Sequence, residues 1–172
     1  MKRVDVRLNL TAVAPVLDFI KRVADGLRSE LVTPFEPAPD DPELTRIWRE
    51  ELIASQARDC EEFLGLFGSE FFATNVIQLS DENIEPVLRA SNLLRMRIRV
   101  QFLERISDDD MESETVDLEE LEQTEADAYV AFLFLDQVQK IILEHFDLVN
   151  GSAVGAESTT EGESEGGGDD ED

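Results

Sequence analysis

Apolar residues recur at intervals of three and four over residues 10–31, which predicts an amphipathic helix with a single buried stripe. The positions of this stripe are Leu10, Val13, Leu17, Ile20, Ala24, Leu27 and Leu31. Asn9 or Thr11 can cap the first amides, and Pro15 is near enough to the start to be tolerated. The first long element is therefore expected to be a helix that faces the core along its whole length.

Two short segments alternate in the manner of strands instead. Val4, Val6 and Leu8 are separated by charged residues, and residues 75–79 could form a second short strand. The two segments could pair as a small ribbon. Residues 33–40 contain three prolines, which indicates an extended connector after the first helix.

A second helix is predicted to begin at Asp41, because a capping carboxylate is followed by Pro42 and Glu43. Its expected buried face consists of Leu44, Ile47, Trp48 and Leu52. The apolar stripe fades over residues 55–59 and resumes at Cys60, so the pattern indicates either one kinked helix or two. Gly68 is a plausible terminator.

The next helix is predicted to be central. It begins at a cap from Ser80 or Asp81 and runs to about Ile106, and its apolar residues sweep through most of the helical circumference. An acidic loop follows over residues 107–123. Thr124 and Asp127 resemble a capping box for a last helix that runs to about Phe146 and is expected to pack on the central one.

Together these elements predict a mainly α fold, a compact bundle of four to five helices with the small ribbon as an optional addition. Residues 1–150 are expected to form a single helical domain. Residues 151–172 are expected to form a disordered acidic tail rich in Gly, Ser and Glu, because they contain no aromatic residue, Leu or Ile with which to build a core.

The charge balance changes this picture, since 40 acids against 15 bases give a net charge of −25. Eight acids and no base lie after Asn150, so residues 1–150 hold 32 acids and 15 bases, a net charge of −17. Such a field repels phosphates and anionic lipids, which argues against nucleic acid or membrane surfaces as partners and favours a basic protein partner. Adaptation to a salty cytoplasm explains the same acidity without any partner.

Cysteine use and hydropathy indicate a cytoplasmic protein. Cys60 is the only cysteine, so no intrachain disulfide can form, and no signal peptide is recognisable in the sequence. The longest strongly apolar stretch, residues 129–135, is far shorter than the roughly 20 residues that a membrane span requires.

The most unusual feature is a set of polar residues inside the apolar arc of the central helix, namely Asn92, Arg95 and Arg99. A buried guanidinium requires partners, and Asp136, which is isolated among apolar residues of the last helix, is the expected one. Two interpretations remain open. The arginines either form a core ion pair that fixes helix register, or line a cleft for an anionic ligand.

No catalytic or cofactor motif is recognisable. With one His and one Cys, the sequence offers no zinc site, Cys-His dyad or serine triad, and no metal or cofactor is expected. Asp108, Asp110, Glu112, Glu114 and Glu119 match ligand positions of a calcium loop, but Ser113 stands where the loop needs glycine. Weak, nonselective cation association is the expectation for this loop. Cys60 is expected in the core, and His145 at the end of the last helix.

Several segments resemble a bacterial family of unknown function, number two-zero-one-seven in its series. They are the opening Val4-x-Val6-x-Leu8, the Asp41-Pro42-Glu43-Leu44 helix start, the stretch Leu88-Arg89-Ala90-x-Asn92-x-Leu94-Arg95, and Tyr129-x-x-Phe132-Leu133. The resemblance covers roughly residues 4–147. It implies a helical fold without an established activity, and it favours an adaptor role because genes of the family often neighbour that of a protease adaptor.

The leading hypothesis is a noncatalytic, regulatory or adaptor-type helical protein that engages a basic or polar protein surface. In it, Arg89, Asn92, Arg95 and Arg99 organise the core or a cleft. The alternatives are a binder of a small anion that uses those arginines, and a structural or salt-adapted protein without a specific ligand.

Overall fold

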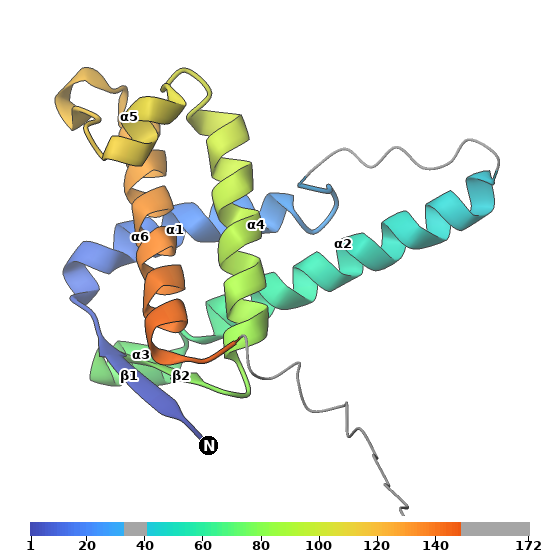
Figure 1. The fold of residues 1–172 in the computed structure, drawn as a ribbon, viewed down its shortest axis with the longest axis horizontal. Coiled ribbons are helices and arrows are strands. Elements are labelled where there is room, and N and C mark those ends of the chain that lie inside the picture. Colours follow the sequence, from blue (N-terminus) through green and yellow to red (C-terminus); the bar gives the residue numbers. More distant parts are fainter. Residues whose placement is uncertain (33–40, 149–172) are drawn as a thin grey trace, which may run out of the picture.

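The computed structural model describes residues 1–32 and 41–148. The predicted connector over residues 33–40 and the predicted tail over residues 151–172 lie outside these residues. The described chain is mainly helical with one small sheet, which confirms the predicted fold class (Figure 1). No helix in this part of the chain has the length and apolar character that crossing a bilayer would require.

The predicted ribbon is present, with a shift of one residue at its ends. Strand β1 (Arg3–Arg7) pairs antiparallel with β2 (Val76–Ser80), and Arg3 lies opposite Ser80. Ile77 and Leu79 of β2 are buried while their neighbours are not, as alternation along a strand requires. Asn75 is not a strand residue. Its φ of 58° ends the preceding helix in a left-handed cap, a conformation that asparagine tolerates well.

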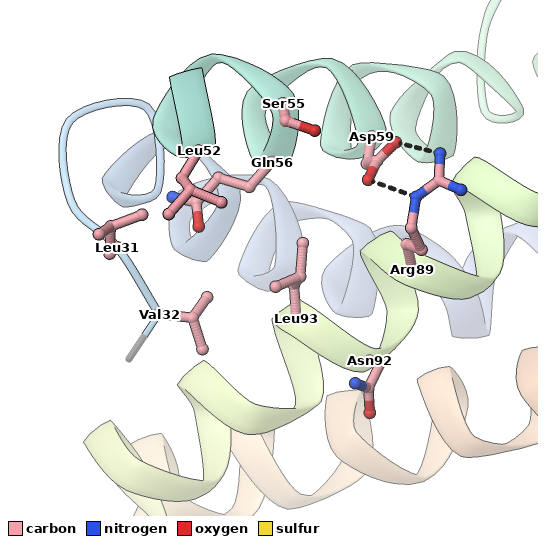
Figure 2. A pocket seen from close by; sticks show the side chains of 9 residues that line it. All are labelled: Leu31, Val32, Leu52, Ser55, Gln56, Asp59, Arg89, Asn92 and Leu93. Atoms are coloured by element: carbon pink, nitrogen blue, oxygen red, sulfur yellow. Dashed lines mark hydrogen bonds and ion pairs between the residues drawn. The ribbon is translucent and has the colours of Figure 1, made fainter. Parts of the chain in front are cut away.

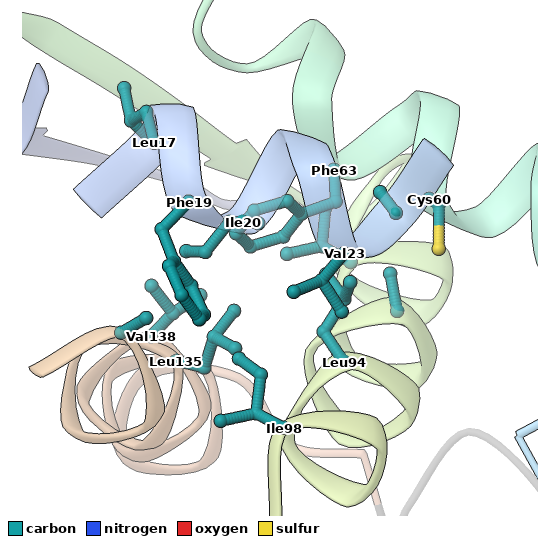
Figure 3. Packing of buried hydrophobic residues seen from close by; sticks show 14 of the residues in the cluster. Leu17, Phe19, Ile20, Val23, Cys60, Phe63, Leu94, Ile98, Leu135 and Val138 are labelled. Atoms are coloured by element: carbon teal, nitrogen blue, oxygen red, sulfur yellow. The ribbon is translucent and has the colours of Figure 1, made fainter. Parts of the chain in front are cut away.

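Three long helices build the body. Helix α4 (Ile84–Phe102) and helix α6 (Gln123–His145) lie side by side, as predicted, and α1 (Leu10–Gly26) packs on both (Figure 1). Their shared core is filled by large aliphatic and aromatic side chains (Figure 3). Fully buried members include Ile20, Phe63, Leu94, Ile98, Leu135 and Ile142.

Helix α2 (Pro42–Gly65) joins this body only through its C-terminal part. Its buried residues are Gln56, Asp59, Cys60 and Phe63, and its N-terminal half projects beyond the other helices (Figure 1). The short helix α3 (Ser69–Thr74) then packs near β2. A short helix α5 (Asp108–Ser113) and a single 3-10 turn (Leu118–Glu120) occupy the predicted acidic loop.

Several predicted helix ends are wrong by a few residues. Helix α1 ends at Gly26 and not near Leu31, and α4 ends at Phe102 and not near Ile106. The N-cap of α6 is Glu122, whose capping box includes Glu125, and not Thr124 with Asp127. Gly68 starts α3 and does not end α2. Each end is set by local hydrogen bonds that the apolar spacing does not specify.

Candidate functional site

The polar residues of α4 do not converge on one site, because their side chains meet different neighbours. Arg89 faces α2 and forms a bidentate pair with Asp59, at 2.9 Å for both Nε–Oδ2 and Nη2–Oδ1. The side chain of Asp59 is only 10% exposed. Its hydrogen bond raises the pKa of Arg89 above the usual arginine range. This pair fixes the C-terminal part of α2 against α4.

Arg95 faces α6, where it makes the contact with Asp136 that the sequence predicts. Nη2 lies 3.2 Å from Oδ1 of Asp136, Nη1 donates to Gln139, and the guanidinium carbon stands 4.5 Å from the centre of the Phe132 ring. Lys140 shares the same carboxylate at 2.8 Å, and this hydrogen bond raises the pKa of Lys140. The arrangement links the two central helices through charges and an aromatic face.

Arg99 turns toward the end of its own helix. It donates to the carbonyl oxygens of Leu103 and Ile106, the latter at 2.9 Å, and it pairs with Asp108 at 2.7 Å. Carbonyl groups after a helix end lack helical partners, so a cation at this place stabilises the exit from α4. Arg99 and Arg95 therefore have separate sets of partners and do not form a shared anion cleft.

The largest departure from the sequence-based expectation concerns Leu44, Ile47, Trp48 and Leu52, which we call the α2 apolar face. These side chains were expected in the core, but they are between 42% and 51% exposed. The expectation is wrong because the N-terminal half of α2 extends past the other helices of residues 1–32 and 41–148 (Figure 1). An apolar stripe marks the face that a helix can bury, but that face is buried only where another element packs on it.

A groove adjoins this face where α2 leaves the body, and we call it the α1–α2–α4 groove. It has a volume of about 310 Å³ and is lined by Leu52 of α2, Leu93 of α4, and Leu31 and Val32 after α1 (Figure 2). The Arg89–Asp59 pair closes one end, and the exposed Asn92 lies on its α4 wall. Leu52 belongs to both surfaces, so the exposed apolar face continues into the groove.

Gln56 explains the shape of this groove. Its side-chain amide donates to the carbonyl oxygens of Leu27, at 2.7 Å, and of Glu30. Both carbonyls follow the end of α1, so this buried amide ties the chain after α1 to α2. The roles of Gln56 and Asp59 were not predicted from the sequence. The only signal was the interruption of the apolar stripe over residues 55–59, which marks the point where α2 contacts polar backbone.

The acidic candidates for cation binding are spread over two elements. Asp108, Asp110 and Glu112 lie in helix α5, whereas Glu119 lies in the 3-10 turn, so these residues do not adopt the open loop that calcium ligation requires. Among residues 1–32 and 41–148, no group of three or more His, Cys, Asp or Glu side chains could hold a metal ion.

The remaining candidates for chemistry have structural environments. Cys60 is buried, and burial raises its pKa from 9.0 to about 11, which keeps the thiol protonated and unreactive at neutral pH. His145 lies in the last turn of α6, where Nδ1 is 3.0 Å from the carbonyl oxygen of Ile141.

No family model, curated protein or solved structure matches this chain, so the resemblance drawn from its sequence motifs stays a prediction.

Proposed function

We propose that this protein is a noncatalytic interaction module that binds a partner protein through the α2 apolar face and the adjoining α1–α2–α4 groove. The observation that supports this most directly is the exposure of Leu44, Ile47, Trp48 and Leu52 on one side of a projecting helix. A row of half-exposed large apolar side chains beside a polar-rimmed groove is typical of surfaces that bury a partner helix.

The chemistry of the partner follows from charge. A second copy of this chain would bring together two molecules with a net charge of −25 each, and that repulsion opposes self-association. The chain's own residues 151–172 lack the Leu, Ile and aromatic side chains that could fill the groove. A partner helix with an apolar ridge would bury the α2 apolar face, and Lys or Arg beside that ridge would be attracted by the negative charge of this protein.

The polar end of the groove fits this assignment. Asp59 already holds Arg89 in two hydrogen bonds, and Nη1 of Arg89 lies 3.7 Å from Glu85. The remaining N–H groups of the guanidinium can only donate, whereas the exposed amide of Asn92 can donate or accept, and both do so only at the rim. Rim contacts of this kind orient a bound helix and add little affinity. The apolar face supplies most of the binding free energy in this proposal.

Site-specific photocrosslinking in a lysate of the cells that make this protein tests the proposal. A photoreactive phenylalanine analogue replaces Ile47 in one variant and Val100, which is 67% exposed on α4, in a matched control. We expect a crosslink from position 47 alone, to a discrete protein whose crosslinked segment is apolar with flanking Lys or Arg. Equal crosslinking from both positions, crosslinking to a second copy, or an acidic crosslinked segment would contradict the proposal.

Charge dependence gives a second readout on the same partner. The association rate should fall several-fold between low salt and about 0.5 M salt, because long-range attraction between opposite charges is screened there. Ile47→Asp should weaken binding at all salt concentrations, whereas Val100→Asp, which adds the same charge elsewhere, should leave it nearly unchanged.

A further inference from the structure

A second cavity adjoins α4, and none of its lining residues belongs to the α1–α2–α4 groove. It has a volume of about 400 Å³, larger than that of the α1–α2–α4 groove. Its walls come from α1, the C-terminal part of α4, and Thr124 at the start of α6. We call it the α1–α4 pocket.

The floor of this pocket is aromatic. Phe19 of α1 and Phe102 of α4 form an edge-to-face pair with ring centroids 5.2 Å apart. Phe19 is almost fully buried and points from α1 toward Leu135 and Val138 of α6, so its ring is held in place by the core (Figure 3). A fixed aromatic floor suits a flat apolar group.

One wall carries a guanidinium without a counter-ion. Arg22 lies 5.4 Å from the Phe19 ring centroid, one helical turn along α1, and it takes part in none of the ion pairs among residues 1–32 and 41–148. Nine of the 12 arginines form ion pairs among these residues, and Arg22 is one of the three that do not. An exposed guanidinium beside an apolar floor is a natural receptor for a carboxylate.

The opposite wall adds a second arginine with spare donors. Arg97 is paired with Glu30 at 2.5 Å and with Gln101 at 3.1 Å. These contacts use two of its five N–H groups, so the others remain able to donate. Glu30 competes with an incoming anion at this wall, which makes Arg22 the main determinant of charge selectivity.

Gly26 leaves the pocket open. It belongs to the last turn of α1, yet a Cβ atom built on it would meet nothing within 4 Å, and its backbone does not adopt the left-handed conformation. Neither packing nor backbone strain therefore requires glycine here, although glycine weakens a helix. Gly26 lines the pocket, so its missing side chain leaves space there.

We infer that the α1–α4 pocket binds a small organic carboxylate with a flat apolar body, whose carboxylate pairs with Arg22 while its ring lies against Phe102 and the small exposed part of Phe19. The inference does not depend on the proposed protein partner, because no residue of the α2 apolar face lines this pocket. The net negative charge of the whole molecule repels anions, so selectivity for the carboxylate must come from Arg22 and Arg97 in the pocket wall.

Calorimetric titration of the full chain with 2-naphthoate and its neutral analogue 2-naphthamide tests the inference. We expect 2-naphthoate to bind at least tenfold more tightly than 2-naphthamide, and Arg22→Gln to remove this difference. Arg49→Gln is the matched control, because Arg49 is also exposed and outside the ion pairs of the described residues, but lies on α2. No binding of 2-naphthoate, or equal binding of the two compounds, would overturn the inference.

A second pair of variants separates pocket filling from unfolding. Gly26→Leu should abolish binding of both compounds while the melting temperature stays equal or rises, since helix propensity improves. Gly65→Leu, at another glycine whose Cβ would meet nothing within 4 Å, should bind 2-naphthoate like the unmodified chain. Undiminished binding by Gly26→Leu would show that the ligand lies elsewhere.

Discussion

At the scale of single residues, the contact between Arg95 and Asp136 shows how a lone carboxylate on an apolar helix face finds its partner. The two side chains are 25% and 19% exposed, and Arg95 Nε has no hydrogen-bond partner among the described residues. This pair was predictable, because Arg95 and Asp136 are charged residues on apolar helix faces and each needs an opposite charge. The contacts of Arg95 with Gln139 and Phe132 were not predictable, because they depend on how α6 is rotated about its axis.

Asp136→Asn should lower the free energy of unfolding by about 1 to 3 kcal/mol, because it leaves the partly buried guanidinium of Arg95 without its carboxylate. Urea denaturation gives the value. The control is Asp108→Asn, which removes the 84% exposed partner of Arg99 and should cost less than about 1 kcal/mol. Equal losses in the two variants would mean that burial does not strengthen the Arg95 pair.

Cys60 predicts a dependence of stability on alkaline pH. Burial raises the pKa of the folded thiol from 9.0 to about 11, so between these values the unfolded chain releases a proton that the folded chain keeps. The contribution of this thiol is complete below pH 9 and is lost as the pH rises toward 11. The free energy of unfolding should therefore fall over this range, at no more than about 1.4 kcal/mol per pH unit.

Cys60→Ala isolates the contribution of this thiol from the other alkaline changes of the chain. The variant should be less stable at pH 7, because it loses a buried side chain, and its stability should fall less steeply between pH 9 and 11. Parallel curves for the variant and the unmodified protein would show that Cys60 contributes nothing to the alkaline loss.

At the scale of secondary-structure elements, α2 consists of two halves with different sources of stability. Its start was predictable, since Asp41 caps the amides of Glu43 and Leu44 at 3.2 and 3.0 Å and Pro42 occupies the first turn. Its orientation was not, because an apolar stripe does not specify which surface covers it. The same limit explains why α3 was missed: six residues are too few for periodicity to identify a helix.

Asp41→Ala should loosen the projecting half of α2 alone. Losing this cap costs about 1 kcal/mol of local helix stability, and residues 42–52 have few core contacts to compensate. Hydrogen exchange should accelerate about fivefold for amides in residues 43–52, with little change around Cys60 and Phe63. Uniform acceleration along α2, with an equal loss of global stability, would mean that the helix unfolds as one unit with the body.

At the scale of the whole molecule, the pairing of α4 with α6 and the ribbon of β1 with β2 both followed from sequence. Wide apolar arcs must bury each other, and a short strand needs a second strand to satisfy its backbone hydrogen bonds. The route of α2 away from the body did not follow, because it depends on where α1 ends and on the amide of Gln56 that ties that end to α2. Polar contacts of this kind set the direction of a helix, but they produce no periodic pattern in the sequence.

The acidity of the chain predicts how salt changes its stability. Ion pairs weaken with added salt, but acids exceed bases so far that repulsion dominates, and screening should stabilise the fold. Between 0.05 and 0.5 M NaCl we expect the melting temperature to rise by about 2 to 4 °C or more. For a domain of this size, such a rise corresponds to an increase of about 1 kcal/mol in the free energy of unfolding. Thermal unfolding followed by circular dichroism provides the measurement.

A chain truncated after Asn150 locates the source of this effect. It keeps a net charge of −17, because only eight of the 40 acids lie beyond that residue. If self-repulsion within the helical body is the cause, most of the salt-dependent rise should survive truncation. Loss of the rise would assign the repulsion to residues 151–172, and a fall of the melting temperature with salt would mean that ion pairs outweigh the excess of acids.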